Sequence, residues 1–222
     1  MRLDLHVHSL HSSDGSATPS EIIRQARKYG LNGVAITDHN SLDGANQARS
    51  EAAEMKDFVV VRGMEVSAKE GHVLVYGTDE TMSKGLAAAE VVERARELGG
   101  IAVAAHPFRF WTGVGEKVVR NVAFTAVEGL NSRSHKAANA RAREIALELQ
   151  KPAIGGSDAH DLGMVGVGVT VFESAAESEA QAIELISKGQ CHPEGMSASP
   201  AMGIRTAFGN LTSGFHRGVK KI

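Results

Sequence analysis

The sequence is poor in the features that would place a protein outside the cell or in a membrane. Cys191 is the only cysteine among 222 residues, so no internal disulfide can form and the chain fits a reducing compartment. No apolar run approaches the roughly 18 residues that a membrane span needs. The N-terminus shows no basic-then-apolar leader. We therefore expect a cytoplasmic protein that does not contact a membrane.

Excess charge of one sign is also missing. The formal net charge is −2, which gives no basic footprint for duplex nucleic acid. A small phosphorylated substrate remains compatible with this charge, because metal ions can supply local positive charge. Neither G-x-G-x-x-G nor G-x-x-x-x-G-K-[ST] occurs in the chain. The glycine-rich phosphate loops of nucleotide-binding folds are therefore not indicated.

Short apolar strands alternate with amphipathic helices along the chain. One helix start is clear, because Thr18 is a good N-cap, Pro19 suits the first helical position and Glu21 completes a capping box. We predict strands over 3–8, 34–37, 58–62, 72–76, 101–105, 124–130, 153–157 and 167–172, and helices over 18–30, 42–55, 84–98, 134–149 and 177–188. This alternation predicts an α/β fold with a parallel sheet covered by helices. We expect one domain over 1–222, with a C-terminal helix and loosely packed tail over 176–222.

Polar side chains that can bind metals cluster at the predicted C-terminal ends of these strands. They are His6, His8, His39, Glu65, His106, Asp158 and His160. Residues i and i+2 of a strand share a face, so His6 and His8 project together. Strand ends converge on one mouth in a barrel but spread along an edge in an open sheet. We therefore predict a barrel of about seven strands, with a metal site at the C-terminal strand ends.

Seven short motifs, taken together, give the sequence a resemblance to a known family. They are Asp4-Leu5-His6-Val7-His8-Ser9, Ser13-Asp14-Gly15, Thr37-Asp38-His39-Asn40, Gly63-Met64-Glu65-Val66, Gly71-His72-Val73, His106-Pro107 and Gly156-Ser157-Asp158-Ala159-His160. In this order, and over about residues 1–175, they resemble the PHP (polymerase and histidinol phosphatase) family of metal-dependent phosphoesterases. The resemblance implies a distorted seven-stranded (β/α) barrel with a trinuclear metal centre in its mouth.

The resemblance also implies which residues hold the three ions. His6, His8, Glu65 and Asp158 would hold the first, Glu65, His72 and His106 the second, and Asp14, His39 and His160 the third. Some family members have histidine where this chain has Asp14, and a carboxylate favours manganese or iron over zinc. Asp14 could instead be a turn residue. His72 begins its strand, so it reaches the mouth only if that strand is antiparallel or bent; otherwise it is structural.

Such a centre suits the hydrolysis of phosphate esters, because bound metals lower the pKa of water towards neutrality. We hypothesise that a hydroxide near Glu65 and Asp158 is the nucleophile, with His160 as a further catalytic residue. Arg109 and Arg133 follow strand ends, and a guanidinium can take a phosphate group bidentately. Either arginine could instead be a solvated loop residue.

Two further assignments stay open at this point. Asp38 either orients a ligating histidine or caps a strand end. Trp111 is the only tryptophan; with Phe108 and Phe110 it could stack on a nucleobase or pack in the core or a lid.

The leading hypothesis is an enzyme, a phosphatase or phosphodiesterase that uses manganese, iron or zinc on a small phosphorylated substrate. A nucleotide, a sugar phosphate and histidinol phosphate all fit this description. The alternatives are an exonuclease acting on nucleic-acid ends, a non-catalytic barrel stabilised by metals, and a hydrolase of carbon–nitrogen bonds. The last is disfavoured because no lysine ends a predicted strand. The oligomeric state does not follow from the sequence.

Overall fold

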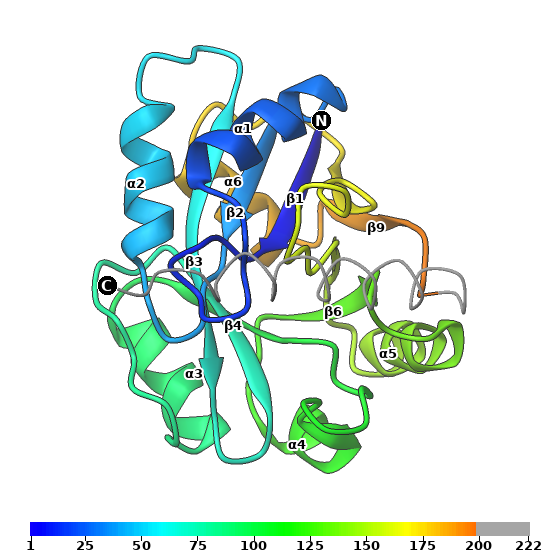
Figure 1. The fold of residues 1–222 in the computed structure, drawn as a ribbon. Helices are drawn as coiled ribbons and strands as arrows, with labels where there is room; N and C mark the ends of the chain where they lie inside the picture. The colour runs from blue at the N-terminus through cyan, green and yellow to red at the C-terminus, as the bar shows by residue number, and fades with distance from the viewer. Residues whose placement is uncertain (199–222) are drawn as a thin grey trace, which may run out of the picture.

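A nine-stranded mixed sheet forms the frame of the molecule in this computed structural model, which describes residues 1–198 (Figure 1). The strands are β1 (Arg2–Val7), β2 (Gly33–Ile36), β3 (Val59–Ser67), β4 (His72–Tyr76), β5 (Ile101–Ala104), β6 (Ala126–Asn131), β7 (Ala153–Gly156), β8 (Gly168–Phe172) and β9 (Cys191–Gly195). Their hydrogen-bonded order is β7-β6-β5-β4-β3-β2-β1-β8-β9. The predictions for residues 199–222, which form most of the tail, lie outside the described residues.

The two halves of the sheet curl round and meet at the C-terminal end of β1. The backbone nitrogen of Asp158, just after β7, donates to the carbonyl of His6 at 2.7 Å, and that of His8 donates to Ala159 at 2.8 Å. A second contact links β8 to β7: the hydroxyl of Thr170 in β8 donates to the carbonyl of Gly155 in β7 at 2.8 Å. The predicted α/β barrel is therefore confirmed, although its sheet has nine strands.

The expectation of a parallel sheet is wrong for two strands, β4 and β8. β4 runs antiparallel to both β3 and β5, β8 is antiparallel to β1, and β9 is antiparallel to β8. The turn between Ser67 and His72 is too short for a parallel crossover, which needs about a dozen residues or more. The reversal of β4 brings its first residue, His72, to the same end of the barrel as the ends of β1, β2 and β5.

Two elements were missed in the sequence, and each has a physical reason. β9 has the sequence Cys-His-Pro-Glu-Gly, and both proline and glycine are depleted in strands. It pairs only with β8 at the edge of the sheet, where proline is tolerated. The other is α4 (Gly115–Asn121), which spans only seven residues and so shows little helical periodicity.

The helices cover the outside of the sheet (Figure 1). They are α1 (Pro19–Lys28), α2 (Asp43–Glu51), α3 (Ala88–Glu97), α4, α5 (Lys136–Glu148) and α6 (Glu179–Ser187). The predicted capping box of α1 is present: Glu21 nitrogen donates to the Thr18 hydroxyl at 3.2 Å, and Thr18 nitrogen donates to the Glu21 carboxylate at 2.9 Å. Among the helices described, none combines the length and apolar character needed to cross a membrane.

The barrel interior below the mouth is filled by apolar side chains from successive strands. Leu3 and Leu5 of β1, Leu74 of β4 and Ile154 of β7 belong to one buried cluster, which also includes residues of α6. Tyr76 is fully buried in the same cluster, and its hydroxyl donates to the Leu5 carbonyl at 2.6 Å. This packed interior leaves the strand ends at the mouth as the place for a site.

Candidate metal centre

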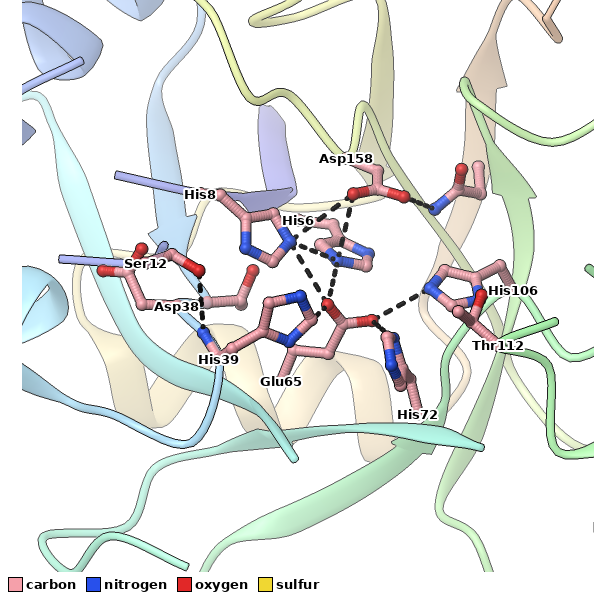
Figure 2. A network of polar contacts seen from close by, with 12 residues as sticks. His6, His8, Ser12, Asp38, His39, Glu65, His72, His106, Thr112 and Asp158 are labelled. Atoms are coloured by element: carbon pink, nitrogen blue, oxygen red, sulfur yellow. Dashed lines mark hydrogen bonds and ion pairs between the residues drawn. The ribbon is translucent and has the colours of Figure 1, made fainter. Parts of the chain in front are cut away.

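Glu65 is the hub of a cluster of histidines at the barrel mouth (Figure 2). One carboxylate oxygen, Oε1, lies 2.8 Å from His72 Nδ1 and 2.9 Å from His106 Nε2. The other oxygen, Oε2, lies within 3.5 Å of three further rings, those of His6, His8 and His39. Glu65 lies inside β3, two residues before its end, where a parallel bridge joins it to His39. Five histidines from four segments of the chain thus converge on one buried carboxylate.

Asp158 forms a second centre, facing the first across His6 of β1 and His8, which follows the end of β1. Its Oδ1 lies 3.6 Å from His6 Nε2, 3.4 Å from His8 Nε2 and 3.5 Å from His160 Nδ1. His6 and His8 project to the same side as predicted, with their Nε2 atoms 3.2 Å apart. Asp158 has a φ of +55°, an unusual value for an aspartate. Such backbone strain clusters at functional sites.

Asp14 gathers the remaining predicted ligands at the outer edge of the mouth. Its Oδ2 lies 2.9 Å from His160 Nε2 and 3.4 Å from His39 Nε2, and its Oδ1 lies 3.9 Å from His8 Nδ1. Asp14 is more exposed than the other carboxylates of the cluster, and the Ser12 hydroxyl donates to it at 2.7 Å. Asp14 therefore belongs to the cluster and is not merely a turn residue.

The buried carboxylates of the cluster need positive charge close to them. Burial acts to lower the pKa of His8, but the carboxylates of Asp158 and Glu65 outweigh it and raise that pKa to about 9. Burial acts to raise the pKa of Glu65, yet the surrounding histidines hold it well below its usual range. The pKa of Asp158 is lowered in the same way, against burial, by His6 and Arg109. Either protons on the imidazoles or bound cations would satisfy these carboxylates.

The arrangement of donor atoms fits divalent metal ions. Four overlapping triads have ligand atoms close enough together to hold an ion: His6–His8–Asp158, His6–Glu65–His106, His8–Asp14–His160 and His8–His39–Glu65. The buried Nδ1 atoms of His8 and His39 have no hydrogen-bond partner. A mixed set of imidazoles and carboxylates suits zinc, iron and manganese. Every predicted ligand except His72 occurs in a triad, and His72 contacts the shared ligand Glu65.

A second layer of polar groups behind the ligands was not found from the sequence. Glu128 of β6 is fully buried; its Oε1 lies 2.9 Å from His6 Nδ1, and its Oε2 accepts from the His106 nitrogen at 2.6 Å. Asn131 donates from Nδ2 to both Glu128 and Asp158. These contacts fix ring orientation and leave His6 Nε2 facing the other ligands. The signal in the sequence was an acidic residue inside an otherwise apolar strand.

The two predicted phosphate-binding arginines both lie at the cluster, in different settings. Arg109 is largely buried; its Nη1 lies 2.8 Å from Asp158 Oδ2, and its Nη2 donates to Asn131 Oδ1. Arg133 is more exposed, with Nη1 2.7 Å from His160 Nδ1 and 3.7 Å from Asp158 Oδ1. Both arginines line a cavity of about 330 Å³ together with Asp14, Glu65, His72 and Asp158. Arg109 thus supports Asp158, whereas Arg133 is the arginine turned more towards solvent.

Of the two roles considered for Asp38, orienting a histidine or capping a strand end, its contacts fit the second. Its carboxylate accepts from the nitrogen of Ser9 at 2.6 Å and from the Ser9 hydroxyl at 2.7 Å, and the described contacts include none to a histidine ring. Gly44 makes room for it, since a Cβ at Gly44 would lie 2.0 Å from Asp38 Oδ2. Asp38 therefore holds the chain where it leaves β1, after the ligand pair His6 and His8.

The imidazoles and carboxylates at the mouth of this closed barrel form a candidate metal centre. Comparison with known families agrees: residues 4–113 match the PHP domain and residues 136–191 match a PHP-associated domain. The chain belongs to the PHP family.

Three relatives illustrate the range of the family. An uncharacterized protein of Methanocaldococcus jannaschii is 34% identical over 118 residues, which cover 49% of this chain and 68% of that protein. A 3′,5′-nucleoside bisphosphate phosphatase of Chromobacterium violaceum is 34% identical over 46% of this chain and 39% of its own length. A phosphoribosyl 1,2-cyclic phosphate 1,2-diphosphodiesterase of Eggerthella lenta is 40% identical over 35% of this chain and 31% of its own length. The match thus spans less than half of either named enzyme.

The fold is shared with solved structures at low sequence identity. A two-domain protein of Bacteroides vulgatus, described as containing a predicted PHP-like metal-dependent phosphoesterase, superposes with a TM-score of 0.74 at 16% identity. The superposition covers 88% of this chain and 65% of that protein.

Proposed function

We propose that this protein hydrolyses phosphate esters of a small molecule at a centre of three divalent metal ions. The observation that carries the proposal is the position of Glu65, which touches five histidines and lies opposite Asp158 across His6 and His8. The small size of the cavity and the modest net charge of −2 favour a small substrate over a long nucleic acid. Two of the relatives are named for small phosphorylated substrates, a nucleoside bisphosphate and a phosphoribosyl cyclic phosphate.

The residues would divide among the three ions as the resemblance to the PHP family implies. His6, His8, Glu65 and Asp158 would hold one ion; Glu65, His72 and His106 a second; and Asp14, His39 and His160 a third. Divalent ions there would lower the pKa of water and neutralise phosphate oxygens. Asp14 adds a hard oxygen ligand, which favours manganese or iron at the third position.

The remaining polar residues would position the substrate. Arg133 faces the cavity and can donate two hydrogen bonds to one phosphate group. Arg109, held by Asp158 and Asn131, adds positive charge on the same side and keeps Asp158 in place. Glu65, Asp158 and His160 all line the cavity at the mouth, and these three are our proposed catalytic residues.

The test is phosphate release from a panel of nucleotides, sugar phosphates and histidinol phosphate by protein loaded with Mn²⁺. The Asp158→Asn variant keeps the shape of the side chain and serves as the control. We expect release from at least one substrate, and none from the variant with the same substrate. Equal release by both proteins would refute the proposed site, and no release by the wild-type protein across the panel would refute the proposed activity.

A further inference from the structure

Two large aromatic side chains stand in solvent beside the metal centre. Phe110 is 85% exposed and Trp111 is 86% exposed, more than any other large apolar side chain in the described part of the chain. Their rings contact each other edge to face, with centroids 4.6 Å apart. Phe108, which the sequence grouped with them, instead packs against the core. The structure thus separates one partly buried aromatic ring from two exposed ones. So much exposed apolar surface beside a cavity indicates a binding site.

The loop that presents these two rings is held firmly in place. Arg109 nitrogen donates to the His106 carbonyl at 2.9 Å, Gly113 nitrogen to Arg109 at 3.0 Å and Gly115 nitrogen to Pro107 at 2.9 Å. The nitrogen of His72 donates to Thr112 at 2.8 Å, which ties the loop to β4. Gly113 packs so tightly that a Cβ there would lie 2.4 Å from the Pro107 carbonyl oxygen. A loop so ordered presents its rings in a fixed place, which lowers the entropic cost of binding.

The exposed rings line the same cavity as the metal-binding residues. Both Phe110 and Trp111 belong to its wall, with Glu65, His106 and Asp158. The three metal-site residues are at most 2% exposed and form the floor, whereas the two rings are almost fully exposed and form the rim. If the phosphate of a substrate binds at the metal-site residues, the group that contacts Phe110 and Trp111 must be separated from that phosphate by a linking part of the molecule.

We infer that Phe110 and Trp111 form a stacking platform for the base of a nucleotide substrate. A nucleobase has the flat π-face that stacks on aromatic side chains, and the ribose supplies the spacer between that base and the phosphate. An ester whose ring is joined directly to the phosphate has no such spacer and would stay near the floor. This inference rests on the proposed phosphoesterase function, because it needs the phosphate at the metal centre. It makes Phe110 and Trp111 residues that determine specificity.

The first test is fluorescence, which does not depend on turnover. Trp111 is the only tryptophan, so the intrinsic tryptophan emission of the protein reports on this platform alone. We expect AMP to quench the emission of the Mn²⁺-loaded protein, and ribose 5-phosphate to leave it nearly unchanged. Equal responses to AMP and ribose 5-phosphate would overturn the inference.

The second test is the ratio of kcat/KM for AMP to that for ribose 5-phosphate. Stacking is worth about 1–3 kcal/mol per base, so Trp111→Leu should lower this ratio between about 5-fold and about 150-fold. Trp111→Phe keeps a ring and should retain most of the preference. Leu147→Ala removes a comparably exposed side chain on α5 and is the matched control. An unchanged ratio in Trp111→Leu would overturn the inference. Quenching by AMP without hydrolysis of any ester of the panel would support the platform and refute the proposed function.

Discussion

Replacing Glu128 by glutamine would change the contacts that orient two predicted ligands, His6 and His106, without removing a ligand. In the native protein Oε1 pairs with His6 Nδ1 at 2.9 Å and Oε2 accepts from the His106 nitrogen at 2.6 Å. An amide has only one oxygen, so its NH₂ group must face one of these two partners. If it faces His106, two donors meet in a buried space. If it faces His6, the ring must accept at Nδ1 and carry its proton on Nε2, the atom that faces the other ligands.

The size of the effect follows from both contacts. Loss of a partner that orients a metal ligand weakens metal binding about 10- to 100-fold, or about 1.4 to 2.7 kcal/mol. A buried donor left without an acceptor costs about 1–3 kcal/mol of folding free energy. In a protein of this size, that corresponds to roughly 2–4 °C in Tm for each kcal/mol. We therefore expect Glu128→Gln to fold, to melt at a lower temperature and to bind metal more weakly.

The assay is a competition titration of Mn²⁺ and Zn²⁺ against a chelator, together with thermal unfolding of the metal-free protein. Glu93→Gln is the matched control, because that carboxylate is 66% exposed and its nearest arginine contact is 3.9 Å away. Identical metal affinity in the two variants would refute the role of Glu128 in orienting His6.

Four further predictions follow from the same structure. Asp158→Asn should abolish turnover while the circular dichroism spectrum stays native; retained activity would remove Asp158 from the centre. His72→Ala should lower the metal content per chain measured by mass spectrometry, because His72 contacts Glu65 at 2.8 Å; an unchanged content would make it a structural residue. Tyr76→Phe should lower stability by about 1 kcal/mol in denaturant titrations, since its hydroxyl donates to Leu5 inside the barrel; an unchanged midpoint would contradict this. Removal of metal with a chelator should lower Tm and abolish activity, and Mn²⁺ should restore both; unaltered melting would show that the carboxylate cluster does not bind metal.

The convergence of the candidate ligands could be predicted because their pattern depends on local geometry. The alternation of side chains along a strand places His6 and His8 together, and the convergence of strand ends in a barrel brings in Glu65, His106 and Asp158. His72 was the difficult case, because its role depended on the direction of one strand. The antiparallel pairing of β4 with β3 and β5 places His72 at the mouth, beside Glu65, and its role as a metal ligand stays a prediction.

The support of the site could not be predicted in the same way. Glu128 and Asn131 contact residues far away in the chain, His6 and Asp158. The residues next to Glu128 and Asn131 in the sequence do not indicate these contacts. The different burial of Phe108 and Trp111 could not be predicted either. They lie three residues apart in one loop, and only the folded loop determines which of them packs against the core. β9 was missed because its few strand-forming residues depend on pairing with β8 for their conformation.

The central claim is that turnover depends on metal ions held by this cluster. Its most direct test is the rate of phosphate release from the best substrate of the panel, measured as metal-free protein receives increasing equivalents of Mn²⁺. We predict no release without metal and a rate that rises until three ions per chain are bound. Release that proceeds at full rate in the metal-free protein would contradict the claim.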